Sequence, residues 1–125
     1  MQKIKGESMR VKLLNSAMMP QEGQYNIMSI SKEIFCGYIR RAVEKNILDS
    51  FIGYPQNVEL IKKWSGVTVQ LNRELTTLQD GDLLLIMRLN YRPGAASKGQ
   101  AVQQDQFSFF IASYSSQLQL KMTFV

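Results

Sequence analysis

Hydrophobic residues recur through the middle of the chain at the spacing of amphipathic helices. From residue 31 to 45, apolar side chains fall every three or four positions and charged ones take the opposite side, which predicts a helix of about four turns. Ser31 is its expected N-cap, and Glu33 places a carboxylate in the first turn, where the helix dipole favours it. A second helix is predicted over PQNVELIKKWSG, because Pro55 suits its first position and Gly66 its C-terminal stop. The positions expected to be buried in the two helices are Ile34, Phe35, Tyr38, Ile39, Ala42, Val43, Val58, Leu60, Ile61 and Trp64.

Other stretches have the pattern of strands. VTVQL (67–71) alternates strictly, with Val67, Val69 and Leu71 expected to point inward. LLLIMRL (83–89) follows a turn at Asp80-Gly81 and does not alternate, so we expect a central strand covered on both faces. LQLKMTFV alternates again and is expected to form an edge strand that a neighbour or a second subunit covers. The remaining strand candidates are residues 10–19, 24–30, 106–115 and, as a short connection or strand, 47–54.

Together these elements predict an α+β fold with a mixed sheet of five or six strands and two helices. The 125 residues are expected to form a single domain, 1–125, which buries about two thirds of its unfolded surface, with residues 1–8 as a flexible extension. No apolar stretch reaches the roughly 18 residues of a membrane span and no leader peptide is recognisable, so we expect a cytoplasmic protein. The single cysteine, Cys36, fits a reducing compartment, and we expect it to be a small packing residue rather than a nucleophile.

Charge and the lack of histidine limit the possible chemistry. The net charge of +5 favours an acidic or phosphorylated partner, although a basic surface that serves solubility is an equal reading. The sequence contains no histidine, which excludes a Ser-His-Asp or Cys-His triad and imidazole acid/base catalysis. With one cysteine and no histidine a zinc site is not expected, and no cofactor is predicted.

Three features point to an anionic ligand, and the first is the start of the second helix. The sequence GYPQN brings Gly53, Tyr54 and Gln56 to this point. The backbone N–H groups of Gln56, Asn57 and Val58 are expected to be free there, where the helix dipole is positive, and so to seat a phosphate. Many helices begin with proline and bind nothing, so this feature needs the support of the other two.

The second feature is Asn72-Arg73, which follows the alternating stretch VTVQL. Its arginine is a candidate for binding an anion at the end of a strand. The alternative is a surface turn in which Arg73 pairs with Glu74 or Asp80.

The third feature is the end of the apolar strand at 83–89. Arg88, Asn90 and Arg92 are two residues apart and therefore share one side of an extended chain, with Tyr91 between them. An arginine near the end of a buried strand is costly unless it is paired, so we expect a partner from elsewhere in the fold or from a ligand. A guanidinium that grips a phosphate contributes about 1.5–3 kcal/mol.

The order of these motifs resembles the small viral proteins of the type III anti-CRISPR ring-nuclease family. The resemblance is carried by VKLLNSAMMP, by SFIGYPQNVELIKKWSGVTVQLNRELTTLQDGDLLLIMRL and by the arginine at the end of that strand. It covers about residues 11–94 and, more loosely, the strand at 107–113. Its most specific residues are Asn15, Ile52-Gly53, Asn72-Arg73, Gly81-Asp82 and Arg92.

The resemblance implies a homodimer that binds a cyclic oligoadenylate in a pocket across the two-fold axis. Tyr54 stands where the family has the histidine that protonates the leaving oxygen. The acidic residue of the family would fall in RPGAAS, which contains no carboxylate. The binding role falls on Asn15, Ser16, Ala17, Arg73, Arg88 (commonly Gln in the family) and Arg92.

These departures favour binding over cleavage, because a phenol with a pKa of about 10 is a poor proton source. We therefore expect a phage anti-defence protein, a homodimer or larger homo-oligomer, that sequesters a cyclic nucleotide messenger without cleaving it. Thoeris inhibitors that hold cyclic ADP-ribose isomers have a similar role. Tyr54, Tyr91 and the phenylalanines are candidates for stacking on the bases.

Three alternatives remain open. The first is an active ring nuclease that degrades cyclic oligoadenylate slowly. The second is a basic module that binds nucleic acid. The basic residues are spread over both helices and several loops and do not form a stripe, which argues against this alternative. The third is a structural protein whose arginines pair internally.

Overall fold

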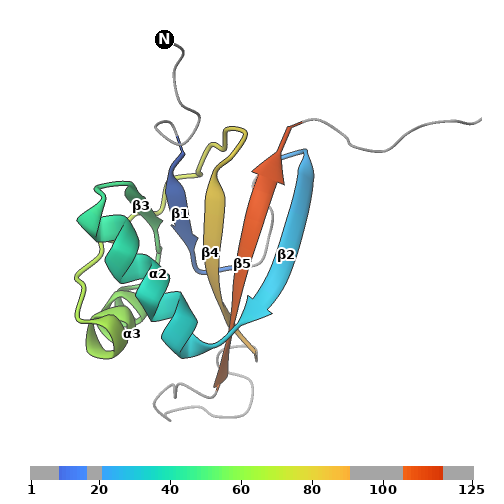
Figure 1. Cartoon of the computed structure of the whole chain (residues 1–125). Coiled ribbons are helices and arrows are strands. Elements are labelled where there is room, and N and C mark those ends of the chain that lie inside the picture. Colours follow the sequence, from blue (N-terminus) through green and yellow to red (C-terminus); the bar gives the residue numbers. More distant parts are fainter. Residues whose placement is uncertain (1–8, 17–20, 91–105, 117–125) are drawn as a thin grey trace, which may run out of the picture.

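The computed structural model describes residues 9–16, 21–90 and 106–116 (Figure 1). Within this part of the chain, five strands form one mixed sheet and two helices pack against it, which confirms the expected α+β fold. The expected sixth strand, 118–125, and the extension 1–8 lie outside the described residues. The elements along the chain are β1 (Val11–Leu14), β2 (Gln24–Ile30), α2 (Lys32–Glu44), β3 (Leu48–Phe51), α3 (Pro55–Ser65), β4 (Leu83–Leu89) and β5 (Phe107–Ser115).

The sheet has the strand order β2-β5-β4-β1-β3. β1 is parallel to both of its neighbours, with Leu14 opposite Phe51 of β3 on one side and Ile86 of β4 on the other. β5 runs antiparallel to β4 and to β2. The carboxyl ends of β3, β1 and β4 therefore meet at one edge of the sheet, which is where parallel α/β sheets most often bind ligands.

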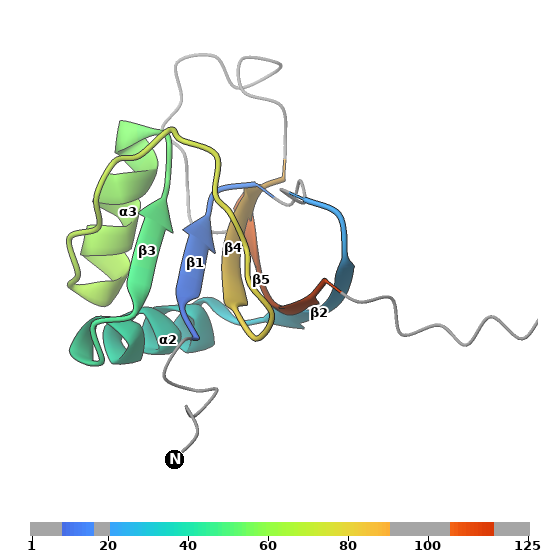
Figure 2. The same ribbon diagram turned by 90° about the horizontal axis from the view of Figure 1, so that it is seen from above.

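Both helices lie on the same side of the sheet (Figures 1 and 2). Their buried side chains, including Phe35 and Ile61, form one core with Leu85 and Met87 of β4. A second, smaller core lies on the opposite face, where Leu78 from the segment between α3 and β4 packs with Leu84 and Ile86. The four β4 residues are all 0% exposed, so the expectation of a central strand covered on both faces is confirmed.

The predicted helix ends are also confirmed. The hydroxyl oxygen of Ser31 accepts a hydrogen bond of 3.1 Å from the backbone nitrogen of Ile34, as an N-cap should. α3 begins at Pro55 and ends before Gly66, whose φ of 82° is the left-handed conformation that glycine adopts most readily. Trp64 packs edge-on against Phe107 and Phe109, as expected of a core residue.

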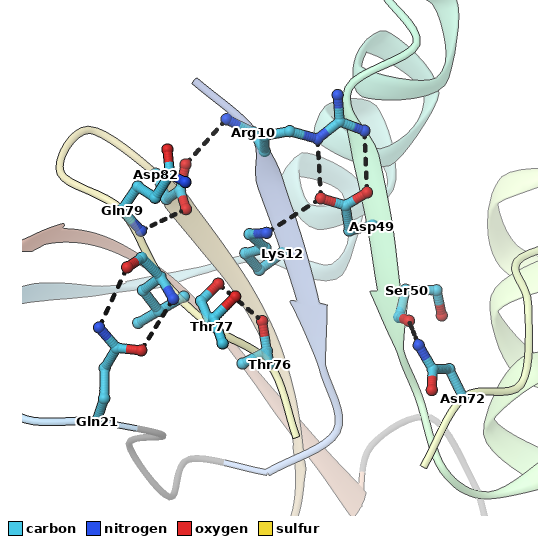
Figure 3. A network of polar contacts seen from close by, with 11 residues as sticks. Arg10, Lys12, Gln21, Asp49, Ser50, Asn72, Thr76, Thr77, Gln79 and Asp82 are labelled. Carbon is cyan, nitrogen blue, oxygen red and sulfur yellow. Dashed lines mark hydrogen bonds and ion pairs between the residues drawn. The ribbon is translucent and has the colours of Figure 1, made fainter. Parts of the chain in front are cut away.

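The prediction of a strand at 67–71 was wrong. Only Leu71 forms a β-bridge, with Ile52, and its side chain is 50% exposed, whereas Val69 is buried. Side chains replace the expected ladder here. The hydroxyl of Ser50 donates to the carbonyl of Gln70. The Asn72 amide donates to the carbonyl of Ser50 (Figure 3). The first strand is likewise shorter than the expected 10–19, since β1 ends at Leu14.

The buried stripe of α2 is narrower than its sequence pattern indicates. Ile34, Tyr38 and Val43 were expected to be buried but are 49%, 37% and 44% exposed. A helix on one face of a sheet buries only the side chains that point at the strands, so these three residues at the margins of the stripe face outward. The buried residues of α2 are Phe35, Cys36, Ile39 and Ala42.

An ion-pair network joins the amino ends of the parallel strands (Figure 3). The guanidinium of Arg10 donates to both carboxylate oxygens of Asp49, at 2.8 and 2.9 Å, and the ammonium of Lys12 lies 3.1 Å from the same carboxylate. The hydrogen bonds from Arg10 lower the pKa of Asp49. The buried carboxylate of Asp82 accepts from the backbone nitrogens of Arg10 and Gln79, and so fixes the turn before β4 to the start of β1.

No helix in the described part of the chain is long and apolar enough to cross a membrane.

Candidate functional site

A cleft of about 380 Å³ opens at the carboxyl edge of the parallel strands. It lies where β1 and β3 end and α3 begins, next to the segment that follows Leu71. Its lining residues are Asn15, Phe51, Gly53, Tyr54, Arg73 and Glu74. The structure thus brings together four of the residues expected to bind the ligand, namely Asn15, Gly53, Tyr54 and Arg73.

Gly53 is held from both sides by two of these residues. Its backbone nitrogen donates a 3.1 Å hydrogen bond to Oδ1 of Asn15, and its carbonyl oxygen accepts a 2.8 Å bond from Nε of Arg73. A Cβ at Gly53 would meet Cγ of Arg73 at 3.3 Å, so glycine allows the arginine to lie close across the backbone. These contacts fix the stem and the Nε end of Arg73.

The bond from Nε to the carbonyl oxygen of Gly53 orients the guanidinium of Arg73 but does not neutralise its charge. Within the described residues it forms no ion pair, so the alternative in which it pairs with Glu74 or Asp80 is not found. The residue is exposed, and Glu74 lies in the same cleft. Because a guanidinium carries five N–H donors and Nε uses one, its terminal nitrogens can still grip a phosphate.

Asn72 has a structural role instead of facing a ligand. Its amide nitrogen donates to the carbonyl of Ser50, and its amide oxygen accepts from the backbone nitrogen of Glu74. Its own backbone nitrogen donates to Ile52. These three bonds fasten the segment that carries Arg73 and Glu74 onto the end of β3.

Tyr54 lines the cleft from the N-cap position of α3, and 54% of its surface is exposed. The expectation of three free N–H groups behind it was wrong. Those of Asn57 and Val58 both donate to the carbonyl of Tyr54, because the first helical turn closes on its N-cap residue. Gln56 alone of the three makes no backbone hydrogen bond with the described residues, and it is not among the cleft-lining residues.

Two lining residues were not singled out from the sequence, although the phenylalanines as a group were candidates for stacking. Phe51 provides an aromatic wall and has the ammonium of Lys12 5.8 Å from its ring centre. Glu74 supplies a carboxylate. Both are sequence neighbours of predicted site residues, one two positions before Gly53 and the other directly after Arg73, and that adjacency was the available signal.

Arg88 and Asn90 lie at the same edge of the sheet but do not line the cleft. Arg88 is two positions beyond Ile86, which pairs with the last residue of β1. It is exposed and stacks on the ring of Phe110 at 5.0 Å, so it does not carry the cost of burial that the sequence suggested. Asn90 accepts a hydrogen bond from Ser108.

The remaining residues considered in the sequence analysis lie outside the cleft or outside the described residues. Ser16 follows Asn15 at the end of β1 and is exposed. Ala17, Tyr91 and Arg92 lie outside the described residues. Among the described residues no group of three His, Cys, Asp or Glu side chains could hold a metal ion. Cys36 is buried, which raises the pKa of its thiol and agrees with a packing role.

The family of the chain follows from comparison with known proteins. A family model described as STIV B116-like matches residues 11–114, from the start of β1 almost to the end of β5. The chain belongs to the STIV B116-like family. All residues that line the cleft fall inside the matched range.

A solved structure supports the same fold. B116 of Sulfolobus turreted icosahedral virus is similar to this chain with a TM-score of 0.70 and 22% sequence identity. The likeness covers 83% of this chain and 98% of that one. No curated protein matches the sequence. The chain therefore has the fold of a viral protein, and at this level of identity the likeness concerns the fold alone.

Proposed function

We propose that this STIV B116-like protein binds a cyclic nucleotide messenger of host immunity and sequesters it without cleaving it. The ligand class is a cyclic ADP-ribose isomer or a cyclic oligonucleotide, and the protein acts as a phage anti-defence factor in the host cytoplasm. The viral family and the cleft at the carboxyl edge support this proposal.

The observation that carries the proposal is the way Gly53 holds Arg73. An arginine whose Nε is already bonded loses less conformational entropy when its terminal nitrogens bind a phosphate. Each such contact contributes about 1.5–3 kcal/mol. Phe51 and Tyr54 add aromatic surface to the same cleft, and aromatic side chains stack on any nucleobase.

The lack of histidine supports binding without turnover. The exposed residue Tyr54 lines the cleft, and the sequence contains no histidine. Proton transfer to a leaving oxygen is efficient only when the pKa of the donor lies near the working pH. Phenols are in general much weaker acids than this requires.

A second copy is part of this proposal. The cleft of about 380 Å³ is near the lower end of the range for ligand sites, so a ring of several nucleotides needs two such clefts facing each other. Leu75 is 91% exposed and Leu71 50%, and both flank the lining residues Arg73 and Glu74. Exposed apolar residues around a half-open cleft are typical of a protein interface.

An active ring nuclease remains the second candidate because of Glu74. This carboxylate lies in the same cleft as Tyr54, where it could accept or deliver a proton. It would also repel a phosphate unless that phosphate sits on the Arg73 side.

A thermal-shift screen against cyclic nucleotides and cyclic ADP-ribose isomers tests the proposal. We expect at least one compound to raise the melting temperature of the native protein and to have no effect on Arg73→Ala. Arg41→Ala, which removes the same charge from the exposed side of α2, should respond like the native protein. A native protein that responds to none of the compounds, or an Arg73→Ala variant that responds fully, would contradict the proposal.

A further inference from the structure

We propose that the outer edge of β2 is an assembly site that accepts the C-terminal segment 117–125 of a second copy as an added strand. The proposal concerns the side of the sheet opposite β3 and does not depend on the ligand.

The edge strand itself provides the first argument. β2 has seven residues, QYNIMSI, without a charge or a proline, and within the described part of the chain it pairs only with β5. Ile27 and Met28 are 51% and 63% exposed, and as consecutive residues of a strand they point to opposite faces of the sheet. Soluble proteins normally guard such an edge with charges, proline or a covering segment, because its unpaired backbone groups recruit other strands.

The opposite edge of the same sheet is guarded in this way. β3 has only four residues, and one of them is Asp49. The segment that follows α3 also covers its end, through the bridge between Ile52 and Leu71 and the bond from Ser50 to Gln70. Compared with β3, the edge of β2 carries no charge and has no second strand beside it among the described residues, which indicates a partner strand.

The C-terminal segment has the composition of such a strand. QLQLKMTFV alternates, with Leu118, Leu120, Met122 and Phe124 on one side. The other side has four polar residues and, at its end, Val125. It lies beyond residue 114, where the family match ends. Its nine residues are enough to pair with all seven of β2.

The path of the chain favours pairing of the C-terminal segment with β2 of a second copy over pairing with its own β2. β5 ends at Ser115, opposite Gln24, so the described chain ends beside the start of β2. To reach the outer edge of its own β2, the C-terminal segment would have to cross the chain entering that strand. That chain is anchored on the sheet, since Tyr114 donates to the carbonyl of Glu22 and the Gln21 side chain donates to Tyr114 and to the carbonyl of Leu78. Connections rarely cross at one edge of a sheet, whereas the edge of another copy is free of this obstacle.

Addition of this strand explains the exposed side chains. Main-chain hydrogen bonds to β2 would supply affinity, and the apolar side of the segment would cover Ile27 or Met28 while its polar side faces water. The geometry points to exchange between copies of this chain and to an assembly larger than the species that forms without residues 117–125.

The mass of the assembly in solution tests this inference. We expect the full-length protein to have at least twice the mass of a variant that ends at Ser116, as measured by light scattering. Met28→Lys places a charge on the exposed edge and should reduce the full-length protein to the mass of the truncated one. The control Val43→Lys, at a similarly exposed apolar residue of α2, should keep the larger mass.

A synthetic peptide of sequence QLQLKMTFV provides an independent measurement. The truncated protein should bind the labelled peptide, and the truncated Met28→Lys variant should bind it at least tenfold more weakly. Circular dichroism establishes that both variants are folded. Equal masses for the full-length and truncated proteins would overturn the proposal, and this result is also expected if the segment folds onto its own β2. The absence of peptide binding would overturn it as well.

Discussion

Nε of Arg73 lies 2.8 Å from the carbonyl oxygen of Gly53, whose backbone nitrogen is bonded to Asn15. Three segments that are far apart in the sequence, the ends of β1 and β3 and the chain after Leu71, thereby meet at one glycine. The anion-binding hypothesis rests on this arrangement, and substitutions at each of the three residues test it differently.

Gly53→Ala should weaken ligand binding more than it weakens the fold. The new Cβ would meet Cγ of Arg73 at 3.3 Å, and the arginine can move away because it is exposed. We expect the free energy of unfolding to fall by about 1 kcal/mol and ligand affinity to fall about tenfold or more. Denaturation and calorimetric titration measure the two effects.

Gly37→Ala is the matched control, because a Cβ at this position in α2 meets nothing within 4 Å. It should stabilise the helix by about 0.5–1 kcal/mol and leave binding unchanged. Equal loss of binding in both variants would contradict the role assigned to Gly53.

Asn15→Asp should separate the structural from the electrostatic role of this position. Aspartate keeps an oxygen acceptor for the nitrogen of Gly53 but adds a negative charge to the cleft. We expect stability within about 0.5 kcal/mol of the native protein, and an affinity for the anionic ligand that is about tenfold lower at low salt and recovers partly at high salt. Unaltered affinity at low salt would place the phosphates elsewhere.

The ion pairs of Asp49 predict a pH dependence of stability. The Arg10 hydrogen bonds lower the pKa of Asp49 in the folded protein, so its contribution is complete above the ordinary aspartate pKa of about 3.9 and is lost as the pH falls through the lower, folded value. Asp49→Asn should cost about 0.5–1 kcal/mol at pH 7, because the pair is partly exposed and screened by solvent. Urea titrations should show the difference from the native protein shrinking below about pH 4. A difference that persists at pH 2 would contradict this account.

Val69 and Leu71 form a matched pair that tests the conformation after α3. Val69 is 5% exposed and Leu71 50%. Val69→Ala should cost about 1–2 kcal/mol, and Leu71→Ala about 0.5 kcal/mol or less, although leucine loses the larger side chain. Denaturation curves measure both changes in the free energy of unfolding. Equal losses would contradict the structure of this segment and support the alternating strand that the sequence pattern predicts.

The elements of the fold that depend on local signals were predictable from sequence. Ser31, Pro55 and Gly66 mark helix ends through backbone chemistry that acts within a few residues, and the unbroken apolar run of β4 signals burial on both faces. The segment 67–71 was not predictable, because the ladder is replaced by side-chain bonds of Ser50 and Asn72 that span 20 and 22 residues of the sequence. Periodicity does not record such long-range side-chain bonds.

The candidate site was predictable only in part, because some of its residues are brought together by contacts that are distant in the sequence. The resemblance marked Asn15, Gly53 and Arg73, which the structure does bring together. Glu74 enters the cleft through the turn that Asn72 fixes, and Phe51 through its place at the end of β3. Arg88 is exposed and stacks on the ring of Phe110, so the expected cost of burying its charge does not arise. The pairing of β4 with β5 places Phe110 near Arg88, and no pattern within β4 reveals that neighbour.

The most direct test of the central claim is the fate of a bound messenger. The native protein is incubated with a labelled cyclic nucleotide identified by thermal shift, the complex is denatured, and the released ligand is examined by mass spectrometry. The account predicts that the cyclic compound is recovered intact from the native protein and that Arg73→Ala retains none. A linear product, absent with Glu74→Gln, would contradict sequestration and establish a ring nuclease instead.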